Sequence, residues 1–122
     1  MILVDTSVWV DHLRSGEPTL VALLGTGRVL THPFIIGELA CGNLRNREEV
    51  LSRLRGLPGA LAVTDEEALF FIDRHRLMGR GIGYVDVHLL AAVTLLGDAR
   101  LWTRDKHLAA IASALGAGFE AP

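Results

Sequence analysis

The sequence has a single cysteine, few aromatic residues and no long hydrophobic run. The lone Cys41 excludes an internal disulfide framework and is typical of a reducing compartment. The apolar segments are short and interrupted by charges, so none is predicted to cross a bilayer. The N-terminal segment also lacks the basic start and longer apolar run of a secretory signal. We therefore expect a cytoplasmic protein without a membrane segment.

What the sequence does contain favours one compact unit with an aliphatic core. Half of its 122 residues are hydrophobic, whereas aromatic residues make up only 6%. This length and composition predict a single domain over residues 1–122. The formal net charge is −2, which by itself argues against a nucleic-acid binder. Basic residues nevertheless gather over 45–55 and 74–80, so the overall balance decides little.

Short apolar stretches alternate with capped, amphipathic segments along the whole chain. Four strands are predicted, over 2–4, 28–30, 60–63 and 100–103, and an edge strand near Phe119 would be a fifth. Helices are predicted over 7–15, 18–24, 33–42, 46–55, 65–78, 85–96 and 105–115. Ser7 and Thr31 are the expected caps of the first and third helices, and 64–67 fits a capping box. The alternation predicts an α/β fold, with a mostly parallel central sheet of four to five short strands and helices on both faces.

Two acidic residues directly follow predicted strands. Asp5 comes after the buried strand 2–4, and Asp105 comes after the strand that ends near Thr103. Because the carboxyl ends of parallel strands form the edge where ligands bind, both carboxylates are expected at that edge.

Two further acidic residues lie inside predicted helices. Glu38 shares a helix face with Phe34 and Ile35, four and three residues before it. Asp86 begins an apolar stripe that continues through Leu89 and Val93, so it too is expected to point toward the core side. Burying an isolated carboxylate there costs several kcal/mol.

Four carboxylates in one pocket repel one another and raise each other's pKa, unless a divalent cation compensates their charge. Ligation by oxygen alone suits Mg²⁺ or Mn²⁺ rather than zinc. Such an ion can activate a water and neutralise charge on a phosphoryl oxygen, which is the chemistry of phosphodiester hydrolysis. The simpler alternatives are that Asp86 and Asp105 only cap helices and that Asp5 is a turn residue.

Four segments, 4–11, 36–39, 86–92 and 101–105, closely resemble the PIN-domain family, in particular the VapC ribonuclease toxins of bacterial toxin–antitoxin pairs. The resemblance spans nearly the whole chain, in the family's order. It implies a three-layer PIN-like fold and a Mg²⁺- or Mn²⁺-dependent endoribonuclease that hydrolyses RNA. It also implies a small antitoxin partner and a homodimer. The catalytic and metal-binding cluster that it implies is Asp5, Glu38, Asp86 and Asp105.

The resemblance extends to hydroxyl residues beside the acids. Thr6, Ser7 and Thr103 match positions that support the cluster in the family. One position departs from the pattern, because His107 stands where many relatives place a further acid or amide. Because of this departure, we expect the site to hold one metal ion in its resting state rather than two.

Basic residues are the candidates for contact with RNA. Their side chains can bind phosphates, although a solvated helix face is the alternative for each. On the first helix, Trp9 and Leu13 either form a groove for an antitoxin helix or pack in the core. The RNA-contact candidates are Arg45, Arg47, Arg104 and His107.

Two other functions are compatible with an acidic α/β protein. One is a phosphoacceptor signalling domain that binds Mg²⁺, with Asp65 as the phosphorylated residue. Such domains have an acidic pair after the first strand and a lysine after the last, whereas here Thr6 follows Asp5 and the only lysine is Lys106. The other is a catalytically silent PIN-like module that only binds RNA or a partner.

Overall fold

The computed structural model describes residues 1–122 and contains a parallel sheet of three strands. The central strand β1 (Ile2–Val4) pairs with β2 (Val29–Leu30) on one side and with β3 (Arg100–Trp102) on the other. All three residues of β1 are buried. A continuous apolar run is what a strand covered on both faces requires, and this run fixes the centre of the fold.

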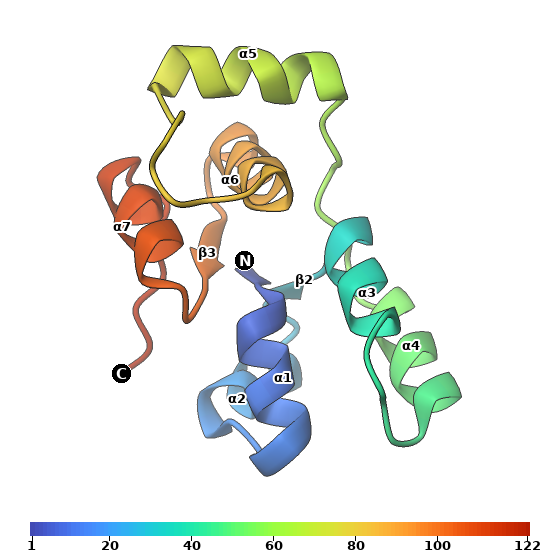
Figure 1. Ribbon diagram of the computed structural model, residues 1–122. Coiled ribbons are helices and arrows are strands. Elements are labelled where there is room, and N and C mark those ends of the chain that lie inside the picture. The colour runs from blue at the N-terminus through green and yellow to red at the C-terminus, as the bar shows by residue number, and fades with distance from the viewer.

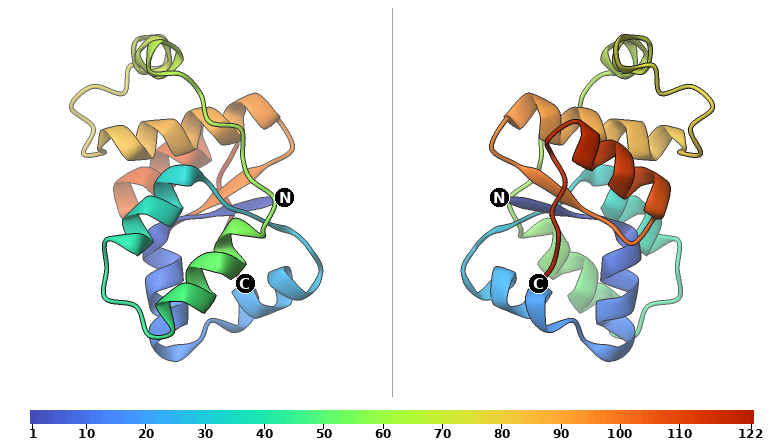
Figure 2. Two further views of the ribbon diagram at one scale, coloured as in Figure 1. Left: turned by 90° about the vertical axis from the view of Figure 1, so that its right-hand side faces the viewer. Right: turned by 90° about the vertical axis from the view of Figure 1, so that its left-hand side faces the viewer.

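Seven helices surround this sheet (Figure 1). Figure 1 shows α6 on one side of the sheet with α5 outside it, and α1 and α2 on the other side. The two views of Figure 2 show the same layers from the sides. The arrangement confirms the predicted α/β fold with helices on both faces. The helices are α1 (Thr6–Ser15), α2 (Pro18–Gly25), α3 (Pro33–Ala40), α4 (Arg47–Arg55), α5 (Asp65–His75), α6 (Tyr84–Leu96) and α7 (Lys106–Ala114).

The core is mostly aliphatic, as the composition predicts. It consists of 31 buried hydrophobic residues in one cluster that joins β1 to α6 and α7. Leu89 and Leu90 of α6 and Leu108 of α7 are fully buried. Each such side chain contributes about 1.5–3 kcal/mol when it leaves water. None of the helices combines the length and the apolar composition needed to cross a membrane.

The capping box before α5 is confirmed. The Thr64 hydroxyl accepts a hydrogen bond from the amide of Glu67 at 3.1 Å, and the Glu67 carboxylate accepts one from the amide of Thr64 at 2.9 Å. The bond from the Thr64 amide lowers the pKa of Glu67, because it stabilises the ionised carboxylate.

The strand predicted over residues 60–63 does not form, so the sheet has three strands rather than four or five. The chain there makes one isolated bridge between Thr31 and Gly59, and a second isolated bridge joins Leu101 to Gly118. Pro58 precedes the first bridge and has no N–H to extend a ladder. Leu61 then turns outward and is 75% exposed. An apolar run this short could not indicate whether a neighbouring strand would be within reach.

Two predicted helix caps are also wrong. Asp5, not Ser7, is the residue before α1, and the Ser7 hydroxyl turns back to bond the Asp5 carboxylate. His32, not Thr31, precedes α3, and its Nδ1 accepts a hydrogen bond from the amide of Phe34 at 3.0 Å. The Ser7 hydroxyl therefore orients the Asp5 carboxylate instead of capping the helix.

Candidate metal centre

Asp5 is the most rigidly held of the four predicted acids. It follows β1 directly, is only 8% exposed, and its amide donates to the carbonyl of Trp102 in the neighbouring strand at 2.9 Å. Its Oδ2 accepts hydrogen bonds from the hydroxyls of Ser7 and Thr103, both at 2.8 Å. Its Oδ1 accepts none, so one oxygen is fixed by the protein and the other is available to a ligand.

Asp105 is joined to Asp5 through Thr103. The Thr103 hydroxyl donates to Asp5 and accepts a hydrogen bond from the amide of Asp105 at 3.1 Å. Oδ1 of Asp105 caps α7 by accepting from the amide of Leu108 at 2.9 Å. The cap interpretation of Asp105 is therefore correct, but it occupies only one of the two carboxylate oxygens.

Asp86 combines a cap role with electrostatic coupling to the other acids. It lies in the first turn of α6, where its Oδ2 accepts from the amide of Gly83 at 3.1 Å. Burial raises the pKa of Asp86, and the nearby carboxylates of Asp5, Asp105 and Glu38 raise it further, while the Gly83 bond opposes the shift. The charges of all three other acids are therefore felt at Asp86, which puts the four in one electrostatic neighbourhood.

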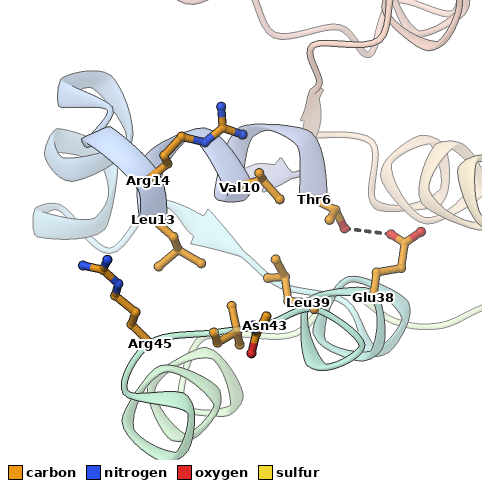
Figure 3. A pocket seen from close by; sticks show the side chains of 10 residues that line it. Thr6, Val10, Leu13, Arg14, Glu38, Leu39, Asn43 and Arg45 are labelled. Atoms are coloured by element: carbon orange, nitrogen blue, oxygen red, sulfur yellow. Dashed lines mark hydrogen bonds between the residues drawn. The ribbon is translucent and has the colours of Figure 1, made fainter.

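Glu38 reaches this neighbourhood from the edge of α3 rather than from its buried face. Its Oε1 accepts a hydrogen bond from the hydroxyl of Thr6 at 2.7 Å (Figure 3). The buried stripe of α3 is formed by Ile35 and Leu39, whereas Glu38 and Phe34 are exposed. The prediction that Glu38 loses its hydration on an apolar face is therefore wrong.

The four carboxylates offer a consistent set of donors. Each has one oxygen bound by a protein donor and a second oxygen that accepts no hydrogen bond. No three histidine, cysteine or acidic side chains stand close enough together to enclose an ion by themselves. Mg²⁺ does not need such a cage, because it is usually held by one or two carboxylates and keeps several waters. The donor set fits a hydrated Mg²⁺ or Mn²⁺ ion.

Three of the four basic RNA-contact candidates have their side chains occupied. The guanidinium of Arg104 pairs with Asp11 at 3.1 Å and with Glu17 at 2.6 Å. Arg47 donates to the carbonyl of Gly42, and His107 lies against Gly81, so closely that a Cβ there would be 2.6 Å from its Nδ1.

Arg45, the fourth candidate, has no ion pair and lines the same cleft as Glu38. The amide of Arg104 donates to the Ser7 hydroxyl at 3.0 Å, which makes Arg104 a positioning residue for the loop that carries Asp105.

Sequence reasoning missed two features of the site. One is the backbone amide of Gly83 that holds Asp86, and the other is Arg14, which lines the cleft beside Glu38. No local pattern marks either one, since an amide donor has no side-chain signature and Arg14 lies on an exposed helix face. Of the two residues considered for a partner groove, Trp9 is buried in the core, whereas Leu13 is 41% exposed.

The fold and the site together define a class of protein, namely a parallel α/β domain with acidic residues at the carboxyl edge of its sheet. The family model of the PIN domain matches residues 2–114, and the chain belongs to the PIN-domain family. The chain is 50% identical, over 116 residues, to "Ribonuclease VapC32" of two Mycobacterium tuberculosis strains, CDC 1551 / Oshkosh and H37Rv. That alignment covers 95% of this chain and 94% of the relative, and the chain is thus a VapC-type member of the family.

Two solved structures share the fold at low sequence identity. FitAcB from Neisseria gonorrhoeae matches with a TM-score of 0.64 and 20% identity, covering 93% of this chain and 94% of the other. FitAB bound to an IR36 DNA fragment matches with a TM-score of 0.59 and 18% identity, covering 93% and 91%. These matches confirm the PIN-like architecture.

Proposed function

We propose that this protein is a metal-dependent endoribonuclease that acts as the toxin of a type II toxin–antitoxin pair. The observation that carries the proposal is geometric: Thr103 joins Asp5 to Asp105 by hydrogen bonds at the carboxyl edge of the sheet, and each of the four acids keeps one oxygen that accepts no hydrogen bond. The relative at 50% identity, named a ribonuclease, supports RNA as the substrate.

We assign separate tasks to the residues of the site. Asp5, Asp86 and Asp105 would hold a hydrated Mg²⁺ or Mn²⁺ ion, in part through its waters, and Glu38 would complete the set from the exposed side. The bound ion supplies an activated water and neutralises charge on the phosphoryl oxygen. Thr6, Ser7 and Thr103 orient the carboxylates through the hydrogen bonds described above, because ligands whose orientation is fixed by neighbouring donors bind metal better.

The proposed function includes a protein partner and a compartment. A small antitoxin would silence the nuclease, and a homodimer is the assembly that the VapC resemblance implies. Exposed Leu13 lies in a second cleft with Leu24, Val50 and Leu57, which offers an apolar surface to a partner helix. The free, exposed Cys41 is in keeping with a reducing cytoplasm.

The phosphoacceptor alternative finds no support in the geometry. Asp65 does not follow a strand; it lies in the first turn of α5, in the outer layer. Its Oδ1 accepts a hydrogen bond from the Tyr84 hydroxyl at 2.6 Å, which raises the pKa of Tyr84. A silent module that only binds RNA remains the alternative to be tested, and the presence of all four acids argues against it.

The decisive experiment incubates the purified protein with total RNA and maps the new 5′ ends. Cleavage is expected with Mg²⁺ or Mn²⁺, and it should stop with a chelator or in the Glu38→Gln variant. Glu48→Gln, which changes an exposed acid in the first turn of α4, is the matched control and should cut like the native protein. Equal cleavage by native protein and Glu38→Gln, or no cleavage by native protein under any divalent ion, would refute the proposal.

A further inference from the structure

A cleft of about 510 Å³ runs from the acid cluster along α1 and the connection between α3 and α4 (Figure 3). Its acidic end is the hydrogen-bonded pair of Thr6 and Glu38. Arg14, on α1, and Arg45, on the facing connection, stand toward the other end. The cleft therefore continues the metal centre into a region of opposite charge.

The two arginines of this cleft are free cations. Both are exposed, and neither makes an ion pair or a side-chain hydrogen bond, in contrast to Arg53 and Arg104, which are paired with acids. A guanidinium presents a fork of donors that matches phosphate oxygens. Two unpaired guanidinium groups at the same end of the cleft, one from each wall, are suited to separate phosphates of an elongated polyanion.

The cleft is also apolar between its charged ends. Val10 and Leu13 are each 41% exposed on one wall, and Leu39 and Leu44 lie on the other. Apolar surface of this kind can take the face of an unstacked base, and the Asn43 amide offers both a donor and acceptors to a base edge. This combination favours a nucleotide strand over a simple anion.

The length of the cleft separates this surface from the reacting bond. Thr6 and Arg14 are eight residues apart on α1, which corresponds to roughly 12 Å along the helix axis. We therefore expect a phosphate at Arg14 to be a different one from the phosphate at the acid cluster. It belongs to a neighbouring nucleotide of the same strand.

We propose that this cleft binds the single-stranded RNA beside the cut, with Arg14 and Arg45 contacting separate flanking phosphates and the apolar walls receiving a base. A single-stranded stretch is required, because bases in a duplex are stacked and cannot enter. The inference rests on the proposed nuclease function, and it makes this cleft the part of the molecule that selects unpaired RNA.

The test measures RNA binding in the Asp5→Asn background, where no residue of the cleft is changed. The probes are a short single-stranded RNA of mixed sequence and the same strand in a perfect duplex, each titrated at several salt concentrations. The duplex should bind more weakly than the single strand. Each lost phosphate contact lowers the slope of log K against log salt by about 0.7 on single strands. Arg14→Gln and Arg45→Gln should each show this decrease, and the double variant about 1.4.

Arg74→Gln is the matched control, because Arg74 is an exposed arginine on α5 and lies outside the cleft. Its slope should equal that of the parent. In the otherwise native enzyme, the double variant should raise KM while kcat is retained, since the contacts are made equally before and during reaction. A thermal melt checks that each variant is folded.

The outcomes separate this inference from the proposed function. An unchanged slope in the double variant, with RNA binding intact in the parent, would overturn the cleft assignment and leave the nuclease standing. Poly-glutamate serves as a probe for an acidic protein segment. If the double variant loses poly-glutamate binding while its RNA slope is unchanged, the cleft would be assigned to such a segment instead. If the native protein cuts no RNA and the Asp5→Asn protein binds none, both fall.

Discussion

The two sides of the acid cluster are built in different ways. On the strand side, Asp5 is buried and its Oδ2 is fixed by two hydroxyls, one of which also holds the amide of Asp105. On the helix side, Glu38 is exposed and is held by the single hydroxyl of Thr6. The strand side is preorganised before any ion binds, whereas the helix side can adjust to the ion and the substrate.

This difference has an energetic basis. Hydrogen bonds to a charged group contribute about 1.5–3 kcal/mol each, so two hydroxyls offset much of the cost of burying the Asp5 carboxylate. Glu38 needs less support, because water solvates its exposed charge. We infer that Asp5 sets the position of the ion and that Glu38 responds to it.

The largest expected effects follow from removing one carboxylate on each side. Asp5→Asn and Glu38→Gln should each reduce RNA cleavage by at least about 100-fold, beyond the 10–100-fold typical for residues that only orient ligands. Asp98→Asn, at an exposed acid outside the cluster, should cleave normally. A nearly full rate for Glu38→Gln would show that the helix side is dispensable and that the two sides are not partners.

Acid should weaken the helix side through His32, the residue that caps α3. Burial and, to a lesser extent, the neighbouring His88 lower the pKa of His32 to about 4. Between pH 6.5 and about pH 4, His32 is protonated in the unfolded chain but not in the folded chain. The free energy of unfolding therefore falls as the pH falls through this range. The loss is at most about 3 kcal/mol.

The measurement for His32 is a series of urea titrations across this pH range. His32→Asn keeps a cap acceptor but cannot titrate, so its stability should fall less than that of the native protein. Near neutral pH the free energy of unfolding should depend on pH in the same way in both proteins, even where its absolute value differs. Parallel curves throughout the range would contradict the role given to His32.

The hydroxyls give a more direct comparison of the two sides. Thr103→Val removes the donor to Asp5 and the acceptor for Asp105, so cleavage should fall about 10–100-fold. Thr6→Val removes only the bond to Glu38 and should cost less. Both rates are measured at saturating metal with Thr26→Val as control, since Thr26 bonds only carbonyls of its own helix. A larger loss of cleavage for Thr6→Val than for Thr103→Val would contradict the difference drawn between the two sides.

The smallest expected effect concerns the repulsion within the metal-free cluster. Burial and three neighbouring carboxylates raise the pKa of Asp86, so its ionisation destabilises the fold as the pH rises above its ordinary value. Asp86→Asn should therefore stabilise the metal-free protein at neutral pH by about 0.5 kcal/mol, and this gain should vanish in acid. Thermal melts in chelator at both pH values check this. A stability difference between Asp86→Asn and the native protein that is the same at both pH values would mean that the cluster does not repel.

Much of the fold follows from local patterns in the sequence. The apolar run of β1, the capping box at Thr64 and the end of α6 at Leu96 each depend on neighbouring residues only, and each is found as predicted. The strand expected over 60–63 depends on whether a partner edge is in reach, and here it meets Thr31 at one residue only.

The candidate site shows the same limit of local information. Asp5 and Asp105 are placed by strand ends, which the sequence marks clearly. The exposure of Glu38 depends on which side of α3 meets the core, and Ile35 and Leu39 define a stripe that leaves Glu38 at its edge. The pairing of Arg104 with Asp11 and Glu17 joins residues far apart in the chain, and nothing local indicates it.

Titration with Mn²⁺, followed by the electron paramagnetic resonance of the free ion, tests most directly whether four carboxylates share one ion. Native protein should remove Mn²⁺ from solution, and Asp5→Asn, Glu38→Gln, Asp86→Asn and Asp105→Asn should each bind it more weakly, with Glu48→Gln unchanged. Binding of native strength in any of the four would contradict the shared site.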